Sequence, residues 1–110
     1  MKIKKIFILV IFMTTLITNA QIKLTGVVKD SIGPLEMANV IALDTISKRI
    51  VSYGFTDVNG QYKLDLQKNT VYNIKISYIG LKSVDDYLKT TDTDVIKNYK
   101  MSNDNMLDEI

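Results

Sequence analysis

Apolar side chains recur at every second position along most of this chain, and that period constrains its fold more than any other feature. The clearest run places Tyr72, Ile74, Ile76 and Tyr78 on one face of an extended segment. A period of two is typical of β-strands with one buried face. Such runs, separated by turn-forming residues, predict seven strands over residues 22–28, 38–43, 50–56, 62–66, 72–78, 81–88 and 95–101. The pattern predicts an all-β fold, an antiparallel seven-stranded β-sandwich.

The turn at residues 57–60 is the strongest short-range signal between two strands. Asn59 and Gly60 tolerate the positive φ angles that a type I′ turn requires at both central positions. We therefore expect the strands on either side to pair as a hairpin. The first of them carries Val51, Tyr53 and Phe55 on the face expected to be buried.

The first 20 residues have the layout of a secretory signal peptide. Three lysines in Met1–Lys5 precede an apolar stretch from Ile6 to Ile17, and Ala20 provides a small residue for cleavage. The apolar stretch is short for a membrane span, although a retained anchor helix is the alternative. Cleavage after Ala20 would leave 11 basic and 12 acidic side chains, a net charge of −1. We expect residues 1–20 to be a signal-peptide helix and the rest to be exported.

The residue types that the chain lacks exclude several kinds of catalytic and metal site. The chain has no His and no Cys, which excludes a His-based triad, a thiol nucleophile, a thiolate zinc site and disulfides. A net charge of +2, all of it from the leader, does not provide the clustered basic face that nucleic-acid binding needs. We expect a protein without catalytic residues, cofactor or metal that binds no nucleic acid.

Five short motifs occur in a fixed order from the first predicted strand to the fifth. They are Leu24-x-Gly26-x-Val28-x-Asp30, Gly33-Pro34-Leu35, Ala38-Asn39-Val40, Thr56-Asp57-x-Asn59-Gly60-x-Tyr62-x-Leu64 and Ile76-Ser77-Tyr78-Ile79-Gly80. In this order they resemble the carboxypeptidase regulatory-like domain, a transthyretin-like (prealbumin-like), Ig-like β-sandwich. The resemblance covers residues 21–101. Leu81 stands where the family usually has an aromatic residue.

The resemblance implies structural roles for sixteen motif residues. They are Gly26, Val28, Asp30, Gly33, Pro34, Ala38, Asn39, Val40, Thr56, Asp57, Asn59, Gly60, Tyr62, Ser77, Tyr78 and Gly80.

The resemblance also implies a function. In exported bacterial proteins this domain commonly follows the signal peptide and precedes the plug and barrel of a TonB-dependent outer-membrane receptor. Residues 102–110 are similar to the linker of such receptors, and Leu107–Ile110 to the start of the segment that enters the plug. We therefore expect a non-catalytic accessory domain in the periplasm, at the outer membrane. We expect it to bind a protein partner and to contact the membrane only through a missing downstream domain.

Two alternative functions remain open at this point. The sandwich of this family also follows zinc carboxypeptidase domains, so the chain could be a regulatory module of such an enzyme. It could equally be a free-standing periplasmic domain that binds glycan or peptide.

Other residue groups have a functional and a structural interpretation, and the structural one is favoured in each case. Residues 57–60 contain part of a calcium-loop pattern, but we expect Thr56 and Asp57 to bond the backbone of their turn. Carboxylates at positions 85, 86, 92 and 94 could form a cation or acid–base site, but solvated loops are expected.

Alternating tyrosines could form a stacking platform, but core packing is expected for Tyr53, Tyr62, Tyr72, Tyr78 and Tyr99. Glycines are expected to serve turns and bulges at Gly26, Gly33 and Gly80.

Overall fold

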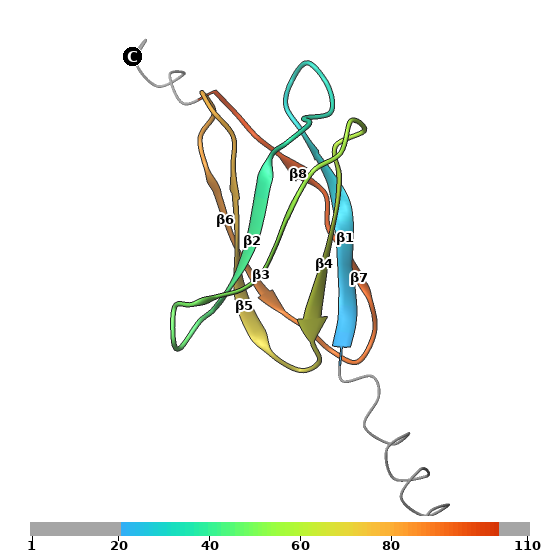
Figure 1. Ribbon diagram of the computed structural model, residues 1–110, viewed down its shortest axis with the longest axis vertical. Coiled ribbons are helices and arrows are strands. Elements are labelled where there is room, and N and C mark those ends of the chain that lie inside the picture. The colour runs from blue at the N-terminus through green and yellow to red at the C-terminus, as the bar shows by residue number, and fades with distance from the viewer. Residues whose placement is uncertain (1–20, 104–110) are drawn as a thin grey trace, which may run out of the picture.

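Two β-sheets pack face to face, as a computed structural model describes for residues 21–103 (Figure 1). One sheet has the strand order β4-β1-β7, with β8 also paired to β1, and the other has the order β3-β2-β5-β6. The strands are β1 (Gln21–Lys29), β2 (Asn39–Asp44), β3 (Ile50–Phe55), β4 (Gln61–Gln67), β5 (Val71–Ser77), β6 (Val84–Lys89), β7 (Val95–Ile96) and β8 (Tyr99–Lys100). The predicted all-β sandwich is confirmed. The predicted signal peptide and residues 104–110 lie outside the described residues.

The core lies between the sheets and follows the period of two that the sequence predicts. Alternate residues of β1, β4, β2 and β5 are buried, and their neighbours along each strand face outward. The buried aliphatic and aromatic side chains are Ile22, Leu24, Val28, Leu35, Ala38, Val40, Ala42, Tyr62, Leu64, Leu66, Tyr72, Ile74, Ile76, Leu88, Tyr99 and Met101. Burying each large one contributes roughly 1.5–3 kcal/mol. Within residues 21–103, no helix is long and apolar enough to cross a membrane.

The last predicted strand, 95–101, is divided into β7 and β8, so the described residues hold eight strands and not seven. Both short strands pair with β1 in parallel, whereas the sequence predicted only antiparallel pairing. The division occurs where the Lys97 amide donates to the Thr25 carbonyl at 2.8 Å. Next along the chain, the Asn98 side chain, in place of a backbone carbonyl, accepts from the Val27 amide at 2.9 Å.

The predicted hairpin between β3 and β4 is wrong, although the turn is in place. The two strands belong to different sheets, because β3 pairs with β2 and β4 pairs with β1. Only Gly60 has a positive φ, of 76°, so the turn is not type I′. The Gly60 amide donates to the Asp57 carbonyl at 2.9 Å, the geometry of a type I turn followed by a left-handed glycine. The turn therefore carries the chain across from one sheet to the other.

Two further boundaries differ from the prediction. Strand β6 begins at Val84 and not at residue 81, because Gly80, with a φ of 83°, forms a turn in which the Leu81 amide donates to the Tyr78 carbonyl. Strand β3 contains an irregularity: Ala42 lies opposite Ser52 while Leu43 lies opposite Ile50, which leaves Val51 as an extra residue.

A substitution at Gly26 tests a close backbone approach inside the sandwich. A Cβ atom at Gly26 would lie 1.7 Å from the Lys97 carbonyl oxygen, whereas one at Gly33 would meet nothing within 4 Å. We expect Gly26→Ala to lower the free energy of unfolding by about 3 kcal/mol or more, since backbone must move. Gly33→Ala is the matched control and should change it by less than about 0.5 kcal/mol. Urea denaturation measures both, and equal effects would contradict this account.

Candidate interaction surface

Most of the sixteen motif residues gather at one end of the sandwich, which we call the loop end. It is formed by residues 30–38, 56–60 and 78–83, the connections that lie together at the top of Figure 1. The Val28 amide donates to the Gly60 carbonyl, and the Leu35 amide donates to the Val28 carbonyl. A Cβ atom at Gly60 would lie 2.5 Å from the Val28 oxygen and 3.0 Å from the Pro34 ring. These motifs are therefore close in space because they build one tight backbone junction.

Thr56 fastens two of these loops together from inside the protein. Its side chain is buried, its hydroxyl donates to the Leu35 carbonyl at 2.6 Å, and the Ala38 amide donates to that hydroxyl at 2.8 Å. The sequence predicted that Thr56 would bond its own turn, which is wrong, because its partners lie in the β1–β2 loop. Thr90 occupies an equivalent place at the opposite end, joining Gln67 and Thr70.

Asp57 and Asp30 serve the backbone of their own turns, as predicted for Asp57. The Asp57 carboxylate accepts from the amides of Asn59 and Gln61 at 2.9 Å each. The Asp30 carboxylate accepts from Ile32 and Gly33, and these bonds hold the pKa of Asp30 below its usual value. Both of these bonds are accepted by one carboxylate oxygen of Asp57, Oδ1. Among residues 21–103, no cluster of three acidic side chains is placed to hold a metal ion.

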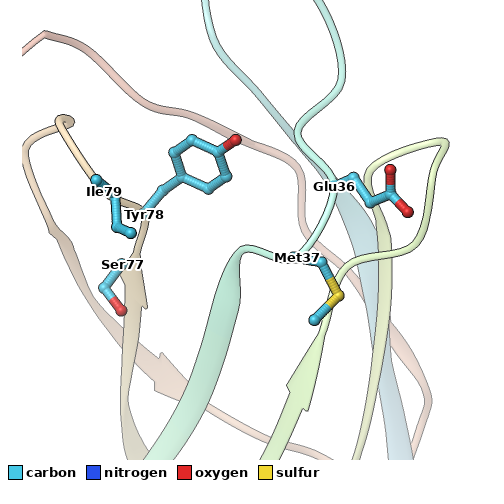
Figure 2. Close-up of a pocket in the computed structure, with 5 residues that line it drawn as sticks. All are labelled: Glu36, Met37, Ser77, Tyr78 and Ile79. Carbon is cyan, nitrogen blue, oxygen red and sulfur yellow. The ribbon is translucent and has the colours of Figure 1, made fainter.

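A notch of about 660 Å³ opens at the loop end between the β1–β2 loop and the end of β5 (Figure 2). Its lining residues are Glu36, Met37, Ser77, Tyr78 and Ile79. Figure 2 shows Tyr78 and Ile79 on one side and Met37 on the other, with the Glu36 carboxylate pointing away from Tyr78. Exposed apolar side chains border it, since Met37 is 62% and Ile79 96% exposed.

One side of the sandwich, where β6 meets the β7–β8 segment, is closed by a group of polar contacts that we call the polar seam. Its members are Tyr62, Asp86, Lys97 and Tyr99. The Asp86 carboxylate accepts from the Lys97 ammonium at 2.8 Å and from the Tyr99 hydroxyl at 2.7 Å. The Tyr62 hydroxyl donates to the Lys97 carbonyl at 2.7 Å, and its ring lies 6.3 Å from that of Tyr99. Asp85 and Asp86 both belong to β6, so neither lies in a loop; the Asp85 side chain is solvated as expected, whereas that expectation is wrong for Asp86, which faces inward.

The charges of the polar seam shift the proton affinities of its members. Burial raises the pKa of Asp86, but hydrogen bonds from Lys97 and Tyr99 and the Lys97 charge outweigh burial and hold that pKa below 3.8. Burial, followed by the nearby Asp86, raises the pKa values of Tyr62 and Tyr99 well above 10. The seam thus joins an ionised carboxylate to two protonated phenols.

Two side chains beyond the seam have roles that the motif residues did not indicate. Asp94, predicted to be a solvated loop carboxylate, accepts from the Lys23 amide at 2.9 Å. Asn98 does the same for Val27. Both side chains therefore take the place of a neighbouring strand along the edge of β1. Isolated polar residues next to short strands carry no spacing signal from which this could be predicted.

Strand β3 turns its bulky apolar side outward, contrary to prediction. Tyr53 is 69% and Phe55 53% exposed, and the inward positions are occupied by Ser52 and Gly54, opposite Ala42 and Val40. A Cβ atom at Gly54 would already lie 3.4 Å from the Leu64 side chain of β4. Small inward residues thus allow β3 to lie close to β4.

The exposed side chains of β3 continue onto β2 as an outer apolar face. Tyr53 lies directly opposite Ile41, and Ile50 opposite Leu43. We define the outer apolar face as Ile41, Leu43, Ile50, Tyr53 and Phe55. Next to it, on β5 and β6, the outward residues Lys75 and Asp85 form an exposed ion pair at 3.8 Å, which marks its polar border.

The predicted tyrosine core is confirmed for three residues and wrong for two. Tyr62, Tyr72 and Tyr99 are buried, whereas Tyr53 and Tyr78 are exposed. Tyr53 faces solvent because the inward side of β3 holds small residues, and Tyr78 follows the last residue of β5.

Comparison with known proteins identifies a family for nearly the whole described chain. The family model of the CarboxypepD_reg-like domain matches residues 24–110. No curated protein sequence matches this chain.

Several solved structures share the fold at low sequence identity. The Bacillus anthracis TIE protein is 16% identical with a TM-score of 0.59, over 77% of this chain and 18% of its own. The 3-chlorocatechol 1,2-dioxygenase from Rhodococcus opacus 1CP is 10% identical with a TM-score of 0.59, over 78% of this chain and 60% of its own. The C-terminal domain of the shaft pilin spaA from Lactobacillus rhamnosus GG is 12% identical with a TM-score of 0.53, over 77% of this chain and 98% of its own. The chain spans less than two thirds of the first two proteins, and these likenesses concern the fold alone.

Removing the Thr56 hydroxyl tests the junction at the loop end. Thr56→Val leaves the Leu35 carbonyl and the Ala38 amide buried without this partner. We expect the free energy of unfolding to fall by about 2–3 kcal/mol in a urea titration. Thr56→Ser keeps the hydroxyl and should cost less than half as much. A Val variant as stable as the Ser variant would contradict the role given to the hydroxyl.

Asp86→Asn tests the polar seam through pH dependence. Because the folded pKa of Asp86 lies below 3.8, its charge stabilises the fold above about pH 4, and this contribution is lost as pH falls through the lowered pKa. We expect Asp86→Asn to cost about 1–3 kcal/mol at neutral pH and to flatten the stability curve below pH 4. Asp85→Asn, which removes an exposed ion pair, should cost less than about 0.5 kcal/mol. Equal losses in the two variants would count against the seam.

Proposed function

The chain belongs to the CarboxypepD_reg-like domain family, and on this premise we propose that it is a non-catalytic, exported accessory domain that acts by binding protein. More specifically, we propose that it is the N-terminal extension of a TonB-dependent outer-membrane receptor, placed in the periplasm. Its partner is the plug or barrel of that receptor.

The outer apolar face is the observation that carries this proposal. Tyr53, Phe55 and Ile50 are each more than half exposed on one strand, and aromatic side chains are enriched at protein interfaces. Covering one such side chain contributes roughly 1.5–3 kcal/mol. Contiguous exposed apolar residues bordered by charge are typical of a docking surface.

The β3 edge supports docking on a face more than addition of a strand. Strand β3 is an edge strand with an extra residue at Val51, and bulges of this kind discourage edge pairing. At the β3 edge, a partner therefore has better access to the outward side chains than to a regular backbone ladder.

The titratable groups support a non-catalytic role. The groups with shifted pKa values in the polar seam, Asp86, Tyr62 and Tyr99, are bound to one another or to Lys97. Their arrangement satisfies buried polar atoms at the join between the two sheets. Such mutual pairing is what a structural network requires.

The reading frame beyond codon 110 tests the receptor assignment directly. We expect it to continue into plug and barrel sequence, and we expect an antibody against this domain to detect it in the outer-membrane fraction of the cell. A stop codon after Ile110, together with a soluble periplasmic product, would favour a free-standing binding domain. A downstream zinc carboxypeptidase domain would favour the regulatory module.

A double substitution on the outer apolar face tests the docking surface. We expect Tyr53→Ser with Phe55→Ser to weaken binding of the domain to the separately expressed plug and barrel at least tenfold, as measured by calorimetry, since the bound state loses aromatic contact area. Ile32→Ser is the matched control, because Ile32 is 93% exposed in the β1–β2 loop, outside the residues that define this face. Unchanged affinity in a folded double variant would rule out the face as the docking surface.

A further inference from the structure

Strand β6 forms one edge of the sheet β3-β2-β5-β6 (Figure 1), and it pairs with β5 along its whole length without a bulge. The Thr90 amide donates to the Thr70 carbonyl just beyond the strands. Because hydrogen-bonded pairs alternate along antiparallel strands, the even-numbered residues of β6 also bond β5. In agreement, the Tyr87 amide lies close enough to the Asp86 carboxylate to lower the pKa of that carboxylate. The residues whose backbone groups point away from β5 are Asp85, Tyr87 and Lys89.

The other edges of the described sandwich are irregular, short or occupied. Strand β3 has an extra residue at Val51, and β7 and β8 have two residues each. On β4, the Gln61 amide already donates to the Asp57 carboxylate at 2.9 Å. The Gln67 amide donates to the Tyr72 hydroxyl at 2.9 Å. Within residues 21–103, no strand pairs with the outer side of β6, so this edge offers a regular ladder to another strand.

We propose that this edge pairs with the same edge of a second copy of the chain, antiparallel about a two-fold axis at Tyr87. A two-fold axis makes an interface complementary to itself, and here it places Asp85 of each copy opposite Lys89 of the other. Charges on an edge strand usually prevent pairing. In this register they attract instead, since both outward pairs join an acid to a base.

The side chains of β6 are available for this contact. Tyr87 is 66% exposed, and the Asp85 side chain is 69% exposed despite its ion pair with Lys75 at 3.8 Å. Asp86 faces inward, where the other members of the polar seam compensate its charge. Moving the axis to Asp86 would place two Asp86 side chains opposite each other, so charge favours the axis at Tyr87.

The proposed dimer joins two β3-β2-β5-β6 sheets into one continuous sheet. The outer apolar face lies on β2 and β3, and β3 is at the opposite edge of each sheet from β6. That face therefore stays accessible in the dimer. The self-association of β6 goes beyond the proposed function and does not depend on it.

Charge reversal tests the register in residues 21–110, which contain the whole sandwich and its core. We expect Asp85→Lys or Lys89→Asp alone to raise the dissociation constant of the dimer at least tenfold in sedimentation equilibrium, since each creates two like-charged pairs. Mixing the two single variants should restore association, and so should the double reversal, because every pair is complementary again. Lys63→Asp, an outward residue of β4, is the matched control and should leave the constant unchanged.

Cysteine variants locate the two-fold axis independently, because the chain has no Cys. In the proposed register the Cα atoms of the two Tyr87 residues lie about 5.5 Å apart, which a disulfide can span. Those of the two Asp85 residues lie about 13 Å apart. We expect Tyr87→Cys to form an intermolecular disulfide at least tenfold faster than Asp85→Cys.

Several results would overturn the proposal. They are a chain that stays monomeric at millimolar concentration, charge reversals that are not rescued, and equal crosslinking rates at the two cysteine positions. Tyr87→Pro removes an amide that faces away from β5, so the variant is expected to fold. If the natural chain is monomeric and Tyr87→Pro weakens its binding to the separately expressed plug and barrel, the edge belongs to that partner and the dimer is wrong. None of these results decides the docking test at Tyr53 and Phe55.

Discussion

The close approach of the Lys97 carbonyl to Gly26 is the constraint on which one whole side of the sandwich depends. Lys97 can donate its amide to Thr25 and lie across β1 only because position 26 has no side chain. The Tyr62 hydroxyl then reaches the Lys97 carbonyl, and the Lys97 ammonium reaches Asp86 on the other sheet. The absence of a Cβ atom at Gly26 thus allows the Lys97 contacts that link the two sheets on this side of the sandwich.

The two ends and two sides of the sandwich are closed by different means. Each end is closed by a buried threonine hydroxyl that bonds the backbone of another loop through a pair of short hydrogen bonds. This residue is Thr56 at the loop end and Thr90 at the opposite end. The side at β6 is closed by the charged pair Asp86–Lys97, and the side at β3 by small residues that allow close packing. No buried side-chain polar atom within residues 21–103 lacks a partner, so a small core can tolerate these polar closures.

The alternation of apolar residues was sufficient to predict the strands and the sandwich, but not the direction in which each strand faces. A period of two is the same whether the apolar side faces inward or outward, and β3 has Ser52 and Gly54 on its inward side. The turn at Asp57–Gly60 was predictable from local chemistry, whereas the separation of β3 from β4 was not, because it depends on pairing with β2 and β1. Among the motif residues at the loop end, the role of Asp57 was predictable because it bonds its own turn, whereas that of Thr56 was not, because its partners Leu35 and Ala38 lie in another loop.

The same ambiguity explains why the candidate surface was invisible in the sequence. Tyr53 and Phe55 have the composition of core residues, and only the register with Ile41 and Asn39 identifies them as outward. A strand that exposes aromatic residues while burying serine and glycine gives up burial that a swapped pattern would provide. Since the Gly54 position lies close to Leu64 and Lys63, larger inward side chains would push β3 away from β4. Close packing of the sheets therefore forces small residues inward on β3, and the apolar residues that alternate with them become available to a partner.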